Sequence, residues 1–190
     1  MGRPRGFDAD AALDRAVEVF WQKGYEGASL SDLTTAMGIN RPSMYAAYGN
    51  KDDLFRRAVA RYAAQDMAYA ARALEEPTGH AVIETFLRAN ADALTRPDRP
   101  PGCLSIQGGL AGESAPFLAS SRLAGEALLT DRLTQALKAG DFPPETDPAA
   151  LARYVMTVSE GNAVHAAAGV PREALHATVD IALRALPHPA

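Results

Sequence analysis

Cysteine and long hydrophobic runs are scarce in this 190-residue chain. Its one cysteine, Cys103, excludes a disulfide bond within the chain and is typical of a protein from a reducing compartment. No apolar run approaches the roughly 20 residues that a membrane-spanning helix needs. The opening residues MGRPRGF also lack the hydrophobic segment of a secretory signal peptide. We therefore expect a cytoplasmic protein.

The motifs of common enzyme classes are absent as well. The sequence has no Gly-x-Ser-x-Gly of a serine hydrolase, no phosphate-binding Walker loop and no His-Glu-x-x-His zinc motif. Its four histidines lack the paired spacing of metal ligands, and no dense pair of carboxylates stands out. We expect no enzymatic activity, no metal site and no cofactor.

Positive charge is scarce for a protein that would bind nucleic acid, because the formal net charge is −4. The distribution is uneven, however. Residues 1–62 carry nine Lys and Arg against eight Asp and Glu, whereas residues 63–190 carry ten against fifteen. Arg3 and Arg5 precede the first expected helix and are free to reach a phosphate backbone. Net charge alone would not predict DNA binding.

Helix signals are present throughout the chain. Alanine is abundant, β-branched residues are sparse, and no alternating strand pattern occurs. Caps, breaks and hydrophobic periodicity predict an all-α protein of about nine helices. The expected helices span residues 8–23, 30–37, 41–48, 51–74, 79–94, 106–112, 115–139, 148–168 and 172–186.

Residues 29–55, SLSDLTTAMGINRPSMYAAYGNKDDLF, are the most informative stretch. Ser29 and Asp32 form a variant of the capping box at the start of one short helix. Gly38 allows a tight turn, and Asn40 caps a second short helix. This is the pattern of a helix-turn-helix, which places its second helix in the DNA major groove. The same geometry also occurs in packed three-helix modules that bind no nucleic acid.

The side chains of the second short helix suit a DNA contact. Small or planar groups at Pro42 and Ala46 let the backbone approach the duplex, and Arg41 is suited to a guanine edge. The hydroxyls of Ser43 and Tyr45 can reach phosphates. Lys51 follows at the positive N-terminus of the next helix. The expected DNA-binding residues are Arg3, Arg5, Ser29, Arg41, Pro42, Ser43, Tyr45, Ala46 and Lys51.

Residues 6–57 resemble the N-terminal domain of the tetracycline-repressor (TetR) family of transcription regulators. The resemblance rests on AVEVFWQKGYEG at residues 16–27 and on the stretch at residues 29–55. It implies that Ser43, Tyr45 and Lys51 contact phosphates, and that Arg41, Pro42 and Ala46 face bases. It also implies that Tyr48 is a core residue joining the recognition helix to the first helix. At Ala46 and Ala47 family members often carry larger polar residues, so direct readout would rest on Arg41 and on DNA shape.

The rest of the chain resembles the family in layout only. That layout implies a helix-turn-helix DNA-binding domain at residues 1–50 and a ligand-binding and dimerisation domain at residues 51–190, with the helix from residue 51 as connector. The last two helices carry small residues and an apolar face, which favour a four-helix dimer interface. Both faces could instead be used within the monomer. The expected interface residues are Tyr154, Gly161, His165, Leu175, Val179 and Leu183.

An effector cavity is expected among the middle helices. Apolar residues would form its wall, while polar ones such as Asn90 and Glu160 would orient a ligand. Each candidate could equally be ordinary core. The expected ligand-binding residues are Phe86, Asn90, Cys103, Ile106, Phe117, Met156 and Glu160.

These patterns predict a DNA-binding transcriptional regulator. We expect a homodimeric repressor that binds a palindromic double-stranded operator and is released by a small apolar or amphipathic effector. One alternative is a thiol-based sensor acting through Cys103, which lies just before a short helix and close to Arg99 in sequence. The other is an architectural DNA binder without an effector.

Overall fold

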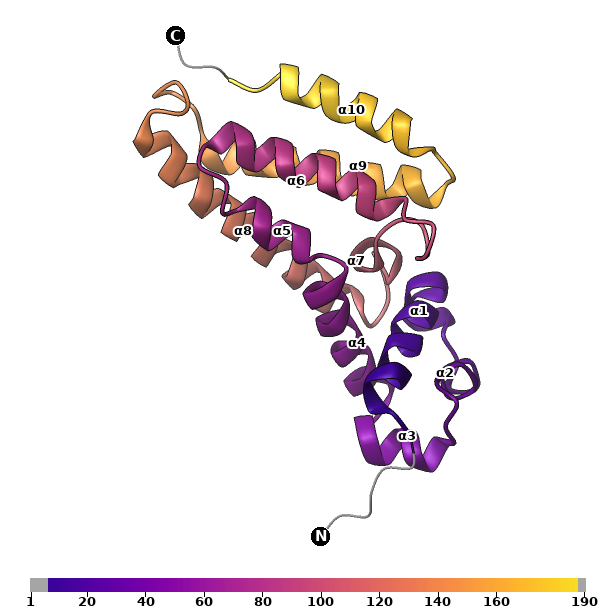
Figure 1. Ribbon diagram of the computed structural model, residues 1–190. Coiled ribbons are helices and arrows are strands. Elements are labelled where there is room, and N and C mark those ends of the chain that lie inside the picture. Colours follow the sequence, from indigo (N-terminus) through magenta and orange to yellow (C-terminus); the bar gives the residue numbers. More distant parts are fainter. Residues whose placement is uncertain (1–6, 188–190) are drawn as a thin grey trace.

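The computed structural model describes residues 7–187, and every regular element in this range is a helix. A small unit, residues 9–65, and a larger helical bundle that follows it lie along one long axis, with the helices Arg41–Tyr48 and Arg172–Arg184 at opposite ends (Figure 1). The all-α expectation is confirmed. The helices are α1 (Ala9–Gly27), α2 (Leu30–Met37), α3 (Arg41–Tyr48), α4 (Lys51–Gln65), α5 (Ala68–Ala73), α6 (Gly79–Leu94), α7 (Leu104–Gln107), α8 (Ala115–Ala139), α9 (Pro148–Ala167) and α10 (Arg172–Arg184).

Local capping explains where the first helices begin. The Asp8 carboxylate accepts from the N–H groups of Asp10 and Ala11, at 3.0 and 3.1 Å. Ser29 and Asp32 form the predicted capping box of α2. Gly38 then adopts the left-handed conformation, with φ 67° and ψ 28°, which makes the tight turn into α3.

Aromatic packing holds α1 and α4 together. Phe20 and Trp21 of α1 are buried, and the Phe20 ring meets the Phe55 ring of α4 edge-on at 4.9 Å. Trp21 meets Tyr62 in the same way at 4.7 Å. At Gly24 the backbone leaves helical geometry, with φ 69° and ψ 174°, so the last turn of α1 is kinked.

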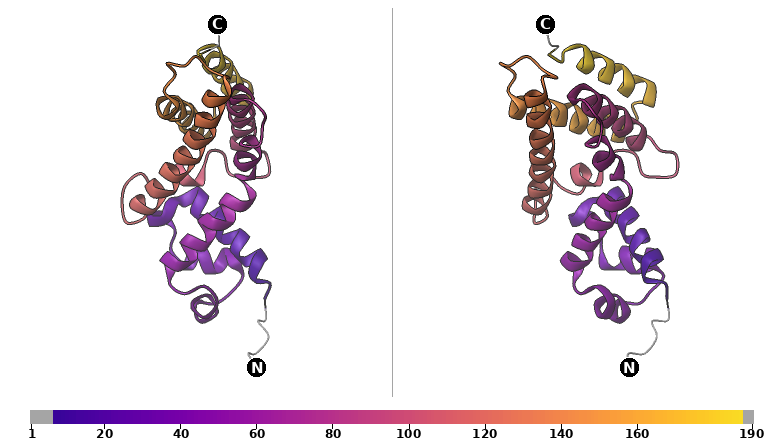
Figure 2. Two further views of the ribbon diagram at one scale, coloured as in Figure 1. Left: turned by 90° about the vertical axis from the view of Figure 1, so that its left-hand side faces the viewer. Right: turned by 60° about the vertical axis from the view of Figure 1, so that its left-hand side comes forward.

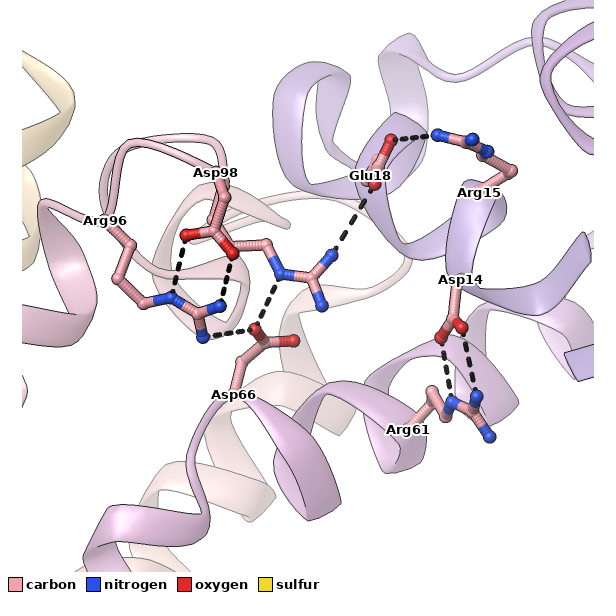
Figure 3. A network of polar contacts seen from close by, with 8 residues as sticks. Asp14, Arg15, Glu18, Arg61, Asp66, Arg96 and Asp98 are labelled. Atoms are coloured by element: carbon pink, nitrogen blue, oxygen red, sulfur yellow. Dashed lines mark hydrogen bonds and ion pairs between the residues drawn. The ribbon is translucent and has the colours of Figure 1, made fainter. Parts of the chain in front are cut away.

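The expected single helix over residues 51–74 is wrong, because two helices, α4 and α5, occupy that range. They are separated at Asp66 and Met67, where Met67 has φ −104° and ψ 11°. Asp66 is buried, and its carboxylate pairs with Arg96 at 3.4 Å and with Arg99 at 3.0 Å (Figure 3). A buried carboxylate needs such partners. The split gives ten helices in the described residues rather than about nine.

The short helix after Cys103 also differs from the prediction. It was expected at residues 106–112, but α7 spans Leu104–Gln107. The chain leaves helical geometry in the glycine-containing loop that follows, and Gly109 has φ 147°. This loop passes directly from the neighbourhood of α1 to the start of α8.

The larger bundle consists of α6, α8, α9 and α10, close to their predicted bounds. In Figure 2 the helix α8 extends along the bundle toward the small unit. Its N-terminal Phe117 meets Phe55 of α4, with ring centroids 6.2 Å apart. Within residues 7–187, no helix is long and apolar enough to cross a membrane.

Candidate nucleic-acid interface and adjoining cavity

Helix α3 presents most of the predicted DNA-binding side chains to solvent. Arg41, Pro42, Tyr45 and Ala46 are exposed, and Ser43 is half-buried. The Tyr45 side chain is 47% exposed, which is unusual for a large aromatic residue beside a packed core. The helix therefore has one face that is free to enter a groove, as major-groove recognition requires.

Two further predicted contacts flank α3. Lys51 opens α4, and its ammonium lies 4.4 Å from the centroid of the Tyr25 ring. Ser29 is exposed, but its hydroxyl already donates to Asp32 at 2.7 Å and accepts from the Asp32 N–H at 3.0 Å. Arg3 and Arg5 lie outside the described residues.

The Asp32 carboxylate is held in its charged form. Lys23 donates to it at 2.7 Å, and Ser29 adds hydrogen bonds from its hydroxyl and backbone. The hydrogen bond from Lys23, followed by those from Ser29, lowers the Asp32 pKa from 3.8 to about 2. This group of residues fixes α2 against the end of α1.

Tyr48 ties α3 to the start of α1. Its buried hydroxyl donates to the Ala9 carbonyl at 2.6 Å, in agreement with the core role that the family resemblance implied. Sequence reasoning missed a second tie, in which Arg61 of α4 holds both carboxylate oxygens of Asp14 at 2.8 and 3.0 Å (Figure 3). Together these contacts fix the orientation of α3 on α1 and α4.

Three hydrogen bonds join α1 to the segment around α7. Trp21 donates its indole N–H to the Gln107 side chain at 3.0 Å. The Tyr25 N–H donates to the Gly108 carbonyl at 3.1 Å, and the Glu113 N–H donates to Glu26 at 2.9 Å. The sequence pattern gave no signal for these bonds, because they connect residues more than 80 positions apart.

A network of ion pairs also connects α1 to the α4–α5 break and to the loop after α6. Arg99 pairs with Asp66 at the α4–α5 break and with Glu18 of α1, at 3.0 and 3.5 Å. Arg96 joins the same Asp66 and also Asp98 (Figure 3). The small unit thus contacts the rest of the chain through these polar groups and through the Phe55–Phe117 contact.

A cavity of about 540 Å³ lies between α4–α5 and α8–α9, with α6 and Cys103–Ile106 completing its wall. Its volume falls within the range, about 300–1,000 Å³, of small-molecule sites. The structure brings all seven predicted ligand-binding residues onto its lining: Phe86, Asn90, Cys103, Ile106, Phe117, Met156 and Glu160. Sequence reasoning missed the charged lining residues Arg56 and Arg122.

Two tyrosines lie behind the polar residues of this cavity. The Tyr62 hydroxyl donates to the Cys103 sulfur at 3.2 Å, and the Asn90 amide N–H donates to the Tyr69 hydroxyl at 2.9 Å. Burial raises the pKa of Tyr62 and of Tyr69, so both are neutral at ordinary pH. Burial likewise raises the pKa of Glu160, although Arg122 opposes this effect.

The predicted dimer residues divide into two groups. Tyr154, Gly161 and His165 are exposed on α9. Leu175 and Val179 are only 1% and 0% exposed, so the expectation that they face a partner is corrected: α10 uses that side to cover its own chain. Leu183 is half-buried. Helix α10 instead exposes Ile181.

No group of three or more metal-ligating side chains occurs in the part of the chain that the structure describes. The exposed face of α3 and the adjoining cavity are therefore the two candidate sites.

Comparison with known proteins places the chain in a family. Residues 12–58 match the family model described as bacterial regulatory proteins, tetR family. The chain is 35% identical, over 98% of its own length and 92% of the relative, to the HTH-type transcriptional repressor ComR of Escherichia coli K12.

Solved structures agree with this match. A cysteine mutant of the TetR family transcriptional regulator CifR, complexed with 26-bp operator DNA, is 41% identical, with a TM-score of 0.93 over 97% of this chain and 100% of that one. A TetR regulator from Rhodococcus sp. RHA1 is also 41% identical, with a TM-score of 0.64 over 95% and 100% of the two chains. The relatives are transcription regulators rather than enzymes. The chain belongs to the TetR family of bacterial transcriptional regulators.

Proposed function

We propose that this protein is a transcriptional repressor that binds a palindromic operator as a homodimer and leaves it when a small molecule fills the cavity. One observation carries the proposal: the cavity wall includes residues of α4 and α7, and both helices contact α1 of the small unit. A molecule in the cavity therefore touches elements that position α3.

DNA binding is assigned to α3 and the start of α4. Arg41, Pro42 and Ala46 would face bases, while Ser43, Tyr45 and Lys51 would contact phosphates. The match to ComR and the operator complex of CifR support this assignment. A protein that works on DNA in this way would act in the cytoplasm.

The homodimer is assigned to the outer faces of α9 and α10. Exposed Tyr154, Gly161, Val164 and His165 recur at helical spacing on α9, and Ile181 is 61% exposed on α10. Apolar and small residues together permit close helix packing around a two-fold axis. Such an axis would present two α3 helices to half-sites about one helical turn, or a multiple of it, apart.

We propose that the two functional units meet at Asp66, whereas the sequence suggested a division after residue 50. Helix α4 packs on α1 through Phe55 and Arg61, so it moves with the DNA-binding helices. The α4–α5 break then acts as the joint between the units. An effector would shift the population of two arrangements only by its different affinity for each.

The operator is found by selecting binding sequences from random duplexes, and complexes are then measured by fluorescence anisotropy. We expect a dimer in light scattering and a two-fold symmetric site. Tyr45→Ala should weaken binding at all sequences, whereas Lys138→Ala, far away at the end of α8, should leave it unchanged. Unaltered binding by the Tyr45 variant, or a monomer at all concentrations, would contradict the proposal.

A second candidate function is a thiol sensor, favoured by the position of Cys103. Its sulfur accepts a hydrogen bond from Tyr62, and the residue lines the cavity. Iodoacetamide would test it: the sulfur forms a bond to carbon, iodide leaves and the thiol proton is released. Loss of operator binding in the wild type but not in Cys103→Ser would support this function. A protein that no small molecule stabilises or releases would instead be an architectural DNA binder.

A further inference from the structure

The geometry points to an effector with an apolar body and one neutral hydrogen-bond donor, which the side-chain oxygen of Asn90 accepts. This inference rests on the proposed ligand-responsive function, since it names the chemistry of the molecule that fills the cavity. An aliphatic or aromatic alcohol, or an amide with a free N–H, has this chemistry.

The first observation is an unpartnered acceptor in the cavity wall. Asn90 of α6 lines the cavity and is only 3% exposed. Its Oδ1 has no hydrogen-bond partner among the described residues, although buried oxygens are normally paired. Because Asn90 lines the cavity, a ligand donor that reaches this buried oxygen can satisfy it.

The second observation is that the amide is held in place. Its Nδ2 donates to the Tyr69 hydroxyl at 2.9 Å, so the other end of the amide group is the oxygen. Tyr69 is itself buried, and its ring packs against Phe86 with centroids 5.9 Å apart. The acceptor is therefore preorganised, which favours a ligand that uses it.

The third observation concerns charge. The charged lining residues have partners elsewhere: Arg122 donates to the Ser105 carbonyl at 2.7 Å and lies 3.9 Å from Glu160, while Arg56 pairs with Asp52 at 2.8 Å. None of these contacts involves Asn90. An ammonium group there would lose its hydration without a counter-charge, and a carboxylate would offer no donor. A neutral donor is the group that fits.

The remaining lining accounts for the apolar body. Aliphatic, aromatic and thioether side chains from α4, α6, α7, α8 and α9 and from both ends of α5 surround the cavity, so the part of a ligand beyond its donor would meet mainly apolar atoms. These lining residues are Val59, Met67, Leu74, Phe86, Ile106, Phe117, Leu128, Leu129 and Met156.

The test compares probes that share one tail. Octanol, methyl octyl ether and octylammonium are titrated into the full-length protein, and binding is measured by calorimetry and by thermal shift. We expect octanol to bind about tenfold or more tightly than the ether, which accepts but cannot donate. Asn90→Leu should remove that difference. Equal binding of octanol and the ether to the wild type, or no binding of either, would overturn the inference.

Two variants guard against a merely structural effect. Asn90→Asp keeps an acceptor and adds a negative charge, so it should move the preference from octanol to octylammonium even if Asn90→Leu fails to fold. Ser159→Ala removes another buried polar group of the cavity lining and should keep the preference for octanol. A preference that Ser159→Ala abolishes, or that Asn90→Asp leaves unchanged, would contradict the role of Asn90.

Operator binding is measured separately in the same samples, so that the two proposals fail in different ways. Octanol that binds through Asn90 but leaves the operator complex intact would contradict release by cavity ligands and would support the inference about Asn90. An operator complex that forms normally while octanol and the ether bind alike would overturn only the inference.

Discussion

The indole N–H of Trp21 donates to the side-chain oxygen of Gln107 across 3.0 Å, and this bond connects α1 to the last residue of α7. Gln107 ends α7, a helix that begins directly after Cys103 and contains Ile106, both of which line the cavity. A ligand that displaces α7 would therefore act directly on α1, without a movement of α4. The α4–α5 break provides a second connection between the DNA-binding helices and the cavity.

Gln107→Leu should weaken this connection. The Trp21 N–H would lose its acceptor in a partly buried position, so the free energy of unfolding should fall by about 1–2 kcal/mol. Because Trp21 is the only tryptophan of the chain, its fluorescence reports directly on the contact. We expect a shifted emission maximum and a lower urea midpoint. Gln135→Leu, on the exposed side of α8, is the control and should change neither.

Tyr48→Phe should reduce both stability and operator affinity. The substitution removes the 2.6 Å hydrogen bond to the Ala9 carbonyl, which costs about 1 kcal/mol and loosens α3 on α1. Tyr45→Phe is a matched comparison, because the Tyr45 side chain is exposed and its hydroxyl, unlike its backbone carbonyl, makes no hydrogen bond within the described residues. Urea unfolding should separate the two, with only Tyr48→Phe destabilised. Equal stability of both variants would contradict the role of the Tyr48 hydroxyl.

Lys51→Ala and Arg41→Ala should affect operator binding differently. A lysine on a phosphate releases counterions, so its loss should reduce the slope of log affinity against log salt by about one per protomer, similarly at every sequence. Arg41→Ala should instead change the preferred bases. Anisotropy titrations at several salt concentrations on the selected site and on point variants distinguish the two effects. A changed preference in the Lys51 variant would count against a phosphate contact.

The capping box of α2 should make the stability of the protein depend on pH in the acidic range. Hydrogen bonds from Lys23 and Ser29 lower the folded-state pKa of Asp32. The ionised carboxylate therefore contributes fully to the free energy of unfolding above pH 3.8, and this contribution is lost as the pH falls toward about 2. Asp32→Asn should therefore be less stable than the wild type near neutral pH, and the gap should narrow within that window. Thermal unfolding across the range measures this. Asp131→Asn, exposed and without an ion pair among the described residues, should show no such convergence.

Local signals explain what the sequence predicted well. Ser29, Gly38 and Asn40 act on neighbouring backbone, so the helix-turn-helix could be read directly from residue types. Most of the seven residues predicted for the cavity lie on apolar helical faces of the middle helices, and this pattern placed them on its lining. A helical face, however, does not reveal which neighbour it packs against. Leu175 and Val179 were for that reason assigned to a partner, although they pack inside their own chain.

Long-range polar contacts explain what the sequence could not predict. Nothing near Asp66 in sequence indicates that Arg96 and Arg99 would surround it and that the connector would break there. The bond between Trp21 and Gln107 likewise depends on two units packing in one orientation. These contacts join the helices of the two candidate sites, and only the tertiary structure reveals them.

The kink at Gly24 has a consequence for engineering. A β-carbon at this position would lie 3.1 Å from the Gln107 carbonyl oxygen, and the positive φ of 69° already disfavours any other residue. The methyl group of an alanine there would press on the backbone of Gln107 and so push α1 away from α7. Gly24→Ala is therefore a variant that strains the packing of α1 on α7 and changes no residue of either proposed site.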